Sequence, residues 1–121
     1  MDDVGAFRRL AAWQKAYDLA RSIYKATETF PRAEQFGLTS QLQRAALSVP
    51  SNIAEGYGRG HQTKDFARFL LVARGSLYEV ETCLLLARDL GFLTESSFEH
   101  LNAMRQESAS ILGGLIKARS E

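Results

Sequence analysis

"SVPSNIAEGYGRG", residues 48–60, is the stretch on which the fold of this chain depends. It contains one proline, three glycines and two serines, and proline costs about 3 kcal/mol in a helix interior. The apolar residues nevertheless keep helical spacing across Pro50, at Leu42, Ala45, Val49 and Ile53. A chain that left the helix at the proline would have no reason to keep that phase. We therefore predict one helix over residues 36–58, kinked near Pro50.

Helical spacing also extends over the rest of the chain, and no strand-like alternation competes with it. The apolar steps predict helices over residues 7–28, 36–58, 63–90 and 95–118. In the first of these, the expected core stripe consists of Leu10, Trp13, Tyr17, Ala20 and Tyr24. Thr63 and Thr94 are expected to cap the third and fourth helices. The prediction is an all-α protein, an up-and-down four-helix bundle, with residues 1–121 in a single domain.

Composition excludes several classes of protein. The chain is 45% hydrophobic and 24% charged, which is ordinary for a globular protein. No apolar run reaches the ~20 residues of a membrane span. The beginning of the chain, MDDVGAFRRLAAW, lacks the apolar core of a signal peptide, and the single cysteine, Cys83, cannot form an intrachain disulfide. We expect a cytoplasmic protein that does not contact membranes.

Polar and small residues share one face of the second predicted helix. At 100° per residue, one arc of about 100° contains Arg44, Ser48, Ser51, Asn52, Glu55 and Arg59. One interpretation is a solvated face. Serine, asparagine and glycine are poor helix formers, however, and they allow a second surface to approach closely. The alternative is a packed contact, within the bundle or between chains, made by Ser48, Ser51, Asn52, Glu55 and Gly56.

A second line of apolar residues marks the third predicted helix. Leu71, Tyr78 and Leu85 repeat at heptad spacing, about 120° from the core stripe, and Gly75 is a small residue beside them. These residues either widen the surface that faces the core or contact a second chain. The second alternative predicts self-association.

Residues with catalytic chemistry are scattered. Neither His61 nor His100 has a partner at metal-ligand spacing, and Cys83 has no activating neighbour. The segment GYGRG lacks the lysine and the preceding strand of a phosphate-binding loop. We expect no enzymatic activity, no catalytic residue, no metal and no cofactor.

Basic residues are the remaining candidates for a binding site. The net charge is +1 and the pI about 7.9, but residues 1–78 have a charge of +4 and residues 79–121 a charge of −3. The candidate nucleic-acid contacts are Arg8, Arg9, Arg44, Arg59, Lys64, Arg68 and Arg74. The alternative is scattered solubilising charge.

Three segments resemble a known bacterial family. They are LAAWQKAYDLARSIYKAT (residues 10–27), FPRAEQFGLTSQLQRAALSVPSNIAEGYGR (30–59) and FARFLLVARGSLYEVETCLLLARDLGFL (66–93). They are similar to the four-helix-bundle proteins encoded within intervening sequences of 23S ribosomal RNA genes. Accessory variability proteins of diversity-generating retroelements look like distant relatives.

The resemblance implies a homopentamer without enzymatic activity and with an undefined cellular role. The distant relatives bind nucleic acid through a basic surface, which makes RNA or DNA a candidate partner here. Two hypotheses follow: an oligomeric scaffold associated with nucleic acid, or an adaptor that presents a surface to another protein.

Overall fold

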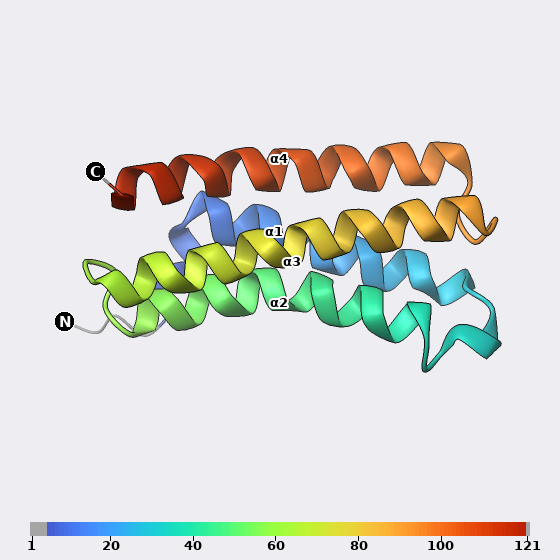
Figure 1. Cartoon of the computed structure of the whole chain (residues 1–121), viewed down its shortest axis with the longest axis horizontal. Helices are drawn as coiled ribbons and strands as arrows, with labels where there is room; N and C mark the ends of the chain where they lie inside the picture. The colour runs from blue at the N-terminus through green and yellow to red at the C-terminus, as the bar shows by residue number, and fades with distance from the viewer. Residues whose placement is uncertain (1–4, 121) are drawn as a thin grey trace.

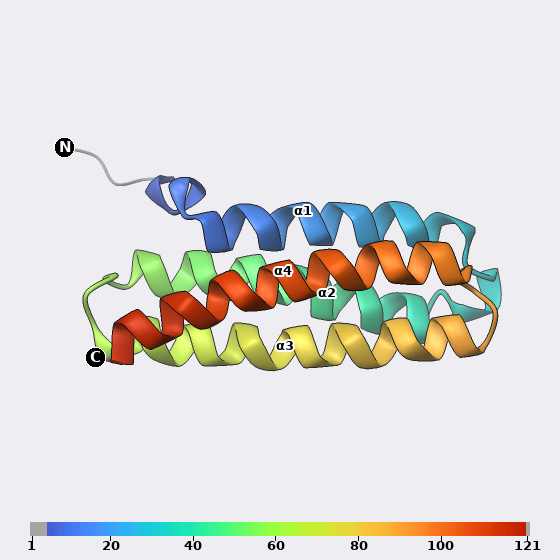
Figure 2. The same ribbon diagram turned by 90° about the horizontal axis from the view of Figure 1, so that it is seen from above.

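Four long helices run alternately up and down in the computed structural model, which describes residues 5–120 (Figures 1 and 2). They are α1 (Ala11–Ala26), α2 (Leu38–Gly58), α3 (Lys64–Asp89) and α4 (Glu95–Ser120). Both α1 and α3 pack against α2 and against α4, so each helix lies beside its neighbours in the chain. The described residues contain no strand. The predicted all-α, up-and-down four-helix bundle is confirmed.

The first helix differs most from its expected bounds of 7–28. A 3₁₀ turn, η1 (Ala6–Arg9), precedes it, and Leu10 is extended between the two, with φ −72° and ψ 127°. The side-chain amide of Gln14 donates a hydrogen bond to the carbonyl oxygen of Arg8 at 2.8 Å, which holds η1 against the start of α1. Two further 3₁₀ turns, η2 (Thr27–Thr29) and η3 (Arg32–Glu34), connect α1 to α2.

The core stripe expected for the first helix was wrong in part. Tyr17 and Tyr24 are 44% and 42% exposed. Ala20 is buried as expected, and Leu10 and Trp13 pack against the core while partly buried. The other buried residues of α1 are Ala12, Ala16, Leu19 and Ile23. This helix is apolar over a wide arc, and the side with alanines lets the neighbouring helices approach closely. The two tyrosines are left at the rim.

Helix α2 continues through Pro50 without interruption, as the apolar phase predicted. Its ribbon is bowed rather than broken (Figure 1). Pro50 is buried, and the side chain of Asn52 donates a hydrogen bond to the carbonyl oxygen of Ser48 at 2.8 Å. These polar groups beside the proline are thus satisfied locally.

The turn between α2 and α3 and the turn between α3 and α4 each contain a glycine with positive φ. Gly60 and Gly91 have φ of 121° and 81°, where other residues are strained. Thr94 caps α4 as predicted, because its hydroxyl accepts a hydrogen bond from the amide of Ser97 at 3.0 Å. Thr63 occupies the N-cap position of α3 as predicted, but the side-chain cap expected from it was wrong: its hydroxyl donates to the carbonyl oxygen of Gly60 at 2.7 Å instead.

A single apolar core runs between the helices, and all four contribute to it. Its largest fully buried side chains include Leu19 of α1, Leu42 of α2, Phe66 of α3 and Leu112 of α4. Burial of each such side chain stabilises the fold by about 1.5–3 kcal/mol.

Candidate functional site

The polar arc of α2 divides between a helix contact and solvent. Gly56 is buried, and a Cβ atom placed on it would lie 2.7 Å from the Cβ of Phe69 and 3.0 Å from the ring of Phe66. About two turns earlier in α2, the hydroxyl of Ser48 lies 2.8 Å from that of Ser76 in α3, which joins the two helices. The small residues therefore allow these two helices to pack closely.

Most of the remaining residues of the polar arc face solvent. Ser51 and Glu55 are exposed, whereas Asn52 is half-buried beside Ser48. Glu55 forms an ion pair with Arg59 one turn later, with a nitrogen–oxygen distance of 3.4 Å. The residues predicted to form one packed contact are thus divided: some lie in the contact between α2 and α3, and the others lie on the solvent-exposed surface.

The second apolar line of α3 is exposed. Leu71, Tyr78 and Leu85 are 47%, 63% and 37% exposed. Two further apolar residues of α3 are exposed with them, as is Leu90 directly after the helix. We call the whole set the α3 face: Leu71, Val72, Tyr78, Leu85, Leu86 and Leu90. Gly75 adjoins it, and no atom lies within 4 Å of the position of its absent Cβ. The bundle leaves this surface uncovered.

A groove continues the α3 face toward α2. It has a volume of about 590 Å³ and its apolar lining includes Leu38, Tyr78, Leu86 and Leu90. Glu34, Glu79 and Cys83 add polar groups. Burial, and secondarily the charge of Glu79, raise the pKa of the Cys83 thiol. We call this the α2–α3 groove.

A second groove lies on the other side of α2, and the sequence did not predict it. Its lining contains Tyr17, Tyr24 and Leu47, which are all exposed, together with Arg21, Lys25 and Glu28. We call it the α1–α2 groove. The sequence signal for this groove is the heptad spacing of Tyr17 and Tyr24, but the same spacing fits the expected core stripe of the first helix.

Basic residues gather at one end of the bundle. The guanidinium groups of Arg59 and Arg68 lie 5.2 and 5.0 Å from the centre of the Phe69 ring. Lys64 begins α3 at this end, and Arg8 and Arg9 lie in η1, which packs against α2 (Figure 1). We call these five residues the basic end.

Two candidate contacts lie elsewhere. Arg44 and Arg74 are exposed but are nearer the middle of α2 and α3. Within the basic end, Asp65 pairs with Arg68 at 3.0 Å and Glu55 pairs with Arg59, so part of its charge is neutralised.

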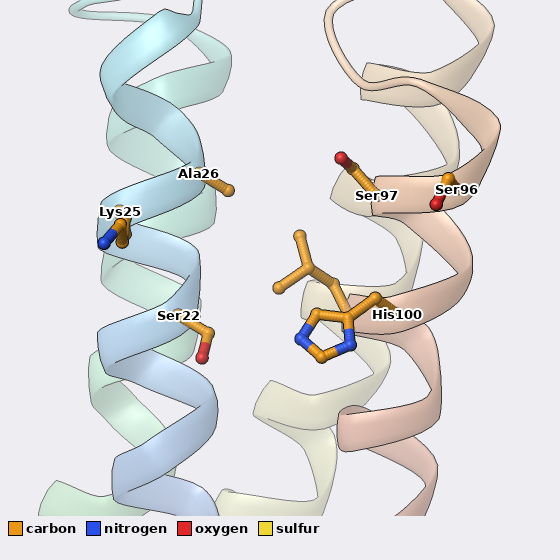
Figure 3. Close-up of a pocket in the computed structure, with 7 residues that line it drawn as sticks. Ser22, Lys25, Ala26, Ser96, Ser97 and His100 are labelled. Atoms are coloured by element: carbon orange, nitrogen blue, oxygen red, sulfur yellow. The ribbon is translucent and has the colours of Figure 1, made fainter.

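The polar pocket between α1 and α4 contains a histidine and three serines (Figure 3). Ser22 of α1 and His100 of α4 point toward the space between the helices, and Ser97 lies one turn before His100. Within residues 5–120, His100 forms no hydrogen bond with these hydroxyls. The pocket thus lacks the base–hydroxyl contact of an activated nucleophile.

The described residues offer neither a cluster of metal ligands nor a helix suited to crossing a membrane. No group of three or more His, Cys, Asp and Glu side chains there is placed to hold a metal ion. No helix in the same part of the chain combines the length and hydropathy that a membrane crossing requires.

Comparisons with known proteins agree with the fold. A family model described as "23S rRNA-intervening sequence protein" matches residues 8–114. A crystal structure from Bacteroides thetaiotaomicron VPI-5482, of a protein with unknown function from the S23 ribosomal protein family, is similar with a TM-score of 0.77 and 24% identity. The similarity covers 88% of this chain and 99% of the other. No curated protein matches this chain.

Proposed function

Since this chain belongs to the 23S rRNA-intervening sequence protein family, we propose that it adopts the assembly its sequence resemblance implies and works as a non-enzymatic homopentamer. The observation that supports assembly most directly is the α3 face. Six large apolar side chains, five on α3 and one directly after it, are each at least 37% exposed and are costly to leave in water. A second copy of the chain would cover them.

Sedimentation velocity at micromolar concentration tests this proposal. We expect a species of about five times the 13.5 kDa of the chain. Tyr78→Glu with Leu85→Glu should give a folded monomer, since two carboxylates would have to be buried in the contact. Ser110→Glu, on the exposed surface of α4, is the matched control and should leave the mass unchanged. A wild-type protein that sediments as a monomer would refute the proposal.

A nucleic-acid-associated scaffold is the second part of the proposal, and the basic end is the observation that favours it. Five of the seven candidate basic residues lie there, and a ring would repeat the cluster in every copy. Such binding depends on phosphate contacts, tolerates sequence changes and weakens steeply as salt rises.

Fluorescence anisotropy with a structured RNA and a duplex DNA, each at two salt concentrations, measures this binding. Replacing Arg8, Arg9, Lys64 and Arg68 with glutamine should weaken it without changing the sedimenting mass. Arg44→Gln with Arg74→Gln is the control and should have a smaller effect. No binding by the wild-type oligomer at low salt would favour the alternative, an adaptor that contacts another protein.

A further inference from the structure

We propose that assembly is head-to-tail: the α3 face and α2–α3 groove of one copy pack into the α1–α2 groove of the next copy. This inference rests on the proposed self-assembly and names the two surfaces that meet. Three features of the described residues support it.

The first feature is that the two surfaces are different and share no residue. The α3 face and its groove lie on one side of α2, and the α1–α2 groove lies on the other. A two-fold dimer would use one surface twice and would leave the other exposed. A closed ring covers both in every copy, because each copy contributes one of the two surfaces to each neighbour.

The second feature is the opposite charge of the two grooves. Glu34 and Glu79 line the α2–α3 groove, which has no basic residue in its lining. The α1–α2 groove is lined by Arg21 and Lys25, with Glu28 as its only acid.

These charges are available to a partner. Arg21, Lys25 and Glu79 are exposed, and none of them forms an ion pair with another residue in the part of the chain that the structure describes. Packing the α3 face against its own copy would bring acidic residues together, whereas packing it into the α1–α2 groove brings opposite charges together.

The third feature is the height of the two surfaces along the bundle. The two grooves are lined by residues from the half of the bundle where α1 finishes, α2 begins and α3 ends. Figure 1 shows these helix ends together, and the α3 face extends from there along α3 to Leu71. Copies joined through surfaces at one height stand side by side with no step along the bundle axis. With no such step, a rotation between neighbouring copies closes the arrangement into a ring, whereas a step between the surfaces would build a filament.

Complementary variants test the pairing directly. The first variant has Tyr78→Glu and Leu85→Glu in the α3 face, and the second has Tyr24→Glu and Leu47→Glu in the α1–α2 groove. Each variant alone should be a monomer. An equal mixture should form a heterodimer of twice the monomer mass, because the intact α3 face of the second variant fits the intact groove of the first. Circular dichroism and thermal melting check that each variant is folded.

The possible outcomes separate this inference from the proposed function. A monomeric wild type refutes assembly itself. A wild-type oligomer combined with a groove variant that still assembles fully refutes head-to-tail packing and leaves assembly standing. A mixture of two folded variants that stays monomeric refutes it as well.

Charge reversal gives a second test with variants that leave the apolar residues in place. Glu79→Lys and Arg21→Glu should each weaken association at low salt by roughly tenfold. The two substitutions in one chain should recover most of the loss, because opposite charges again meet across the contact. If the combined variant associates more weakly than either single variant, these two surfaces do not face each other.

Discussion

Gly56→Ala should destabilise the bundle, although alanine is the better helix former. Inside a helix the exchange gains about 1 kcal/mol from propensity. Here the new methyl group would lie 2.7 Å from the Cβ of Phe69 and 3.0 Å from the ring of Phe66. The Cβ of Phe69 is held by its backbone, so α2 and α3 must move apart.

The net change in stability is the gain in helix propensity minus the cost of overpacking the contact between α2 and α3. Overpacking a core by one or two methyl groups typically costs 1–3 kcal/mol, and a collision with a Cβ atom belongs to the upper part of that range. We therefore expect a net loss of about 1–2 kcal/mol and a fall in melting temperature of roughly 3–8 °C.

Gly113→Ala is the matched control. Gly113 lies inside α4, and no atom lies within 4 Å of the position of its absent Cβ. This substitution should raise the free energy of unfolding by up to about 1 kcal/mol. The assay is thermal and urea unfolding at one fixed protein concentration, because the proposed assembly would make the midpoint depend on concentration. If Gly56→Ala stabilises the protein as Gly113→Ala does, the close contact between α2 and α3 is wrong.

Three further predictions concern single side chains. Ser48→Ala and Ser76→Ala should each cost about 1 kcal/mol, and a double-mutant cycle by urea unfolding should show a coupling of 0.5 kcal/mol or more, because the two hydroxyls bond to each other; additive effects would contradict this. Ser108→Ala should raise the melting temperature, because the Ser108 hydroxyl is buried and has no hydrogen-bond partner among the described residues; a lower melting temperature would mean that the hydroxyl is satisfied. The pKa of Cys83 is raised by burial and by Glu79, so in the Tyr24→Glu, Leu47→Glu variant, which should be a monomer with an open α2–α3 groove, the rate of maleimide labelling should reach its midpoint at a more alkaline pH than for a free thiol, and Glu79→Gln should lower that midpoint; an unchanged midpoint would remove Glu79 as a cause.

The fold was predictable because its main signal is periodic. The apolar phase of α2 survives Pro50, and that continuity identified one helix where composition suggested a break. Periodicity does not say which side of a broadly apolar helix its neighbours will cover. In α1, Tyr17 and Tyr24 fit the core stripe as well as Leu19 and Ile23 do, yet only the latter pair is buried.

The candidate surfaces were predictable only in part. Leu71, Tyr78 and Leu85 could be singled out because they lie well away from the core stripe of α3, and the structure exposes all three. The α1–α2 groove was missed because its tyrosines had been placed in the core. The gathering of Arg59 and Arg68 over one phenylalanine ring required the turn between α2 and α3, which spacing along a single helix does not describe.

The alternating direction of the four helices has a consequence for the potential at the basic end. Each helix has a macrodipole, with partial positive charge at its N-terminus and partial negative charge at its C-terminus. The first turns of α1 and α3 lie at this end together with the last turns of α2 and α4 (Figure 2), so the four backbone contributions largely cancel. Attraction for phosphate there therefore comes mainly from side chains, and most of the field at that end can be removed by substitution without altering the helices.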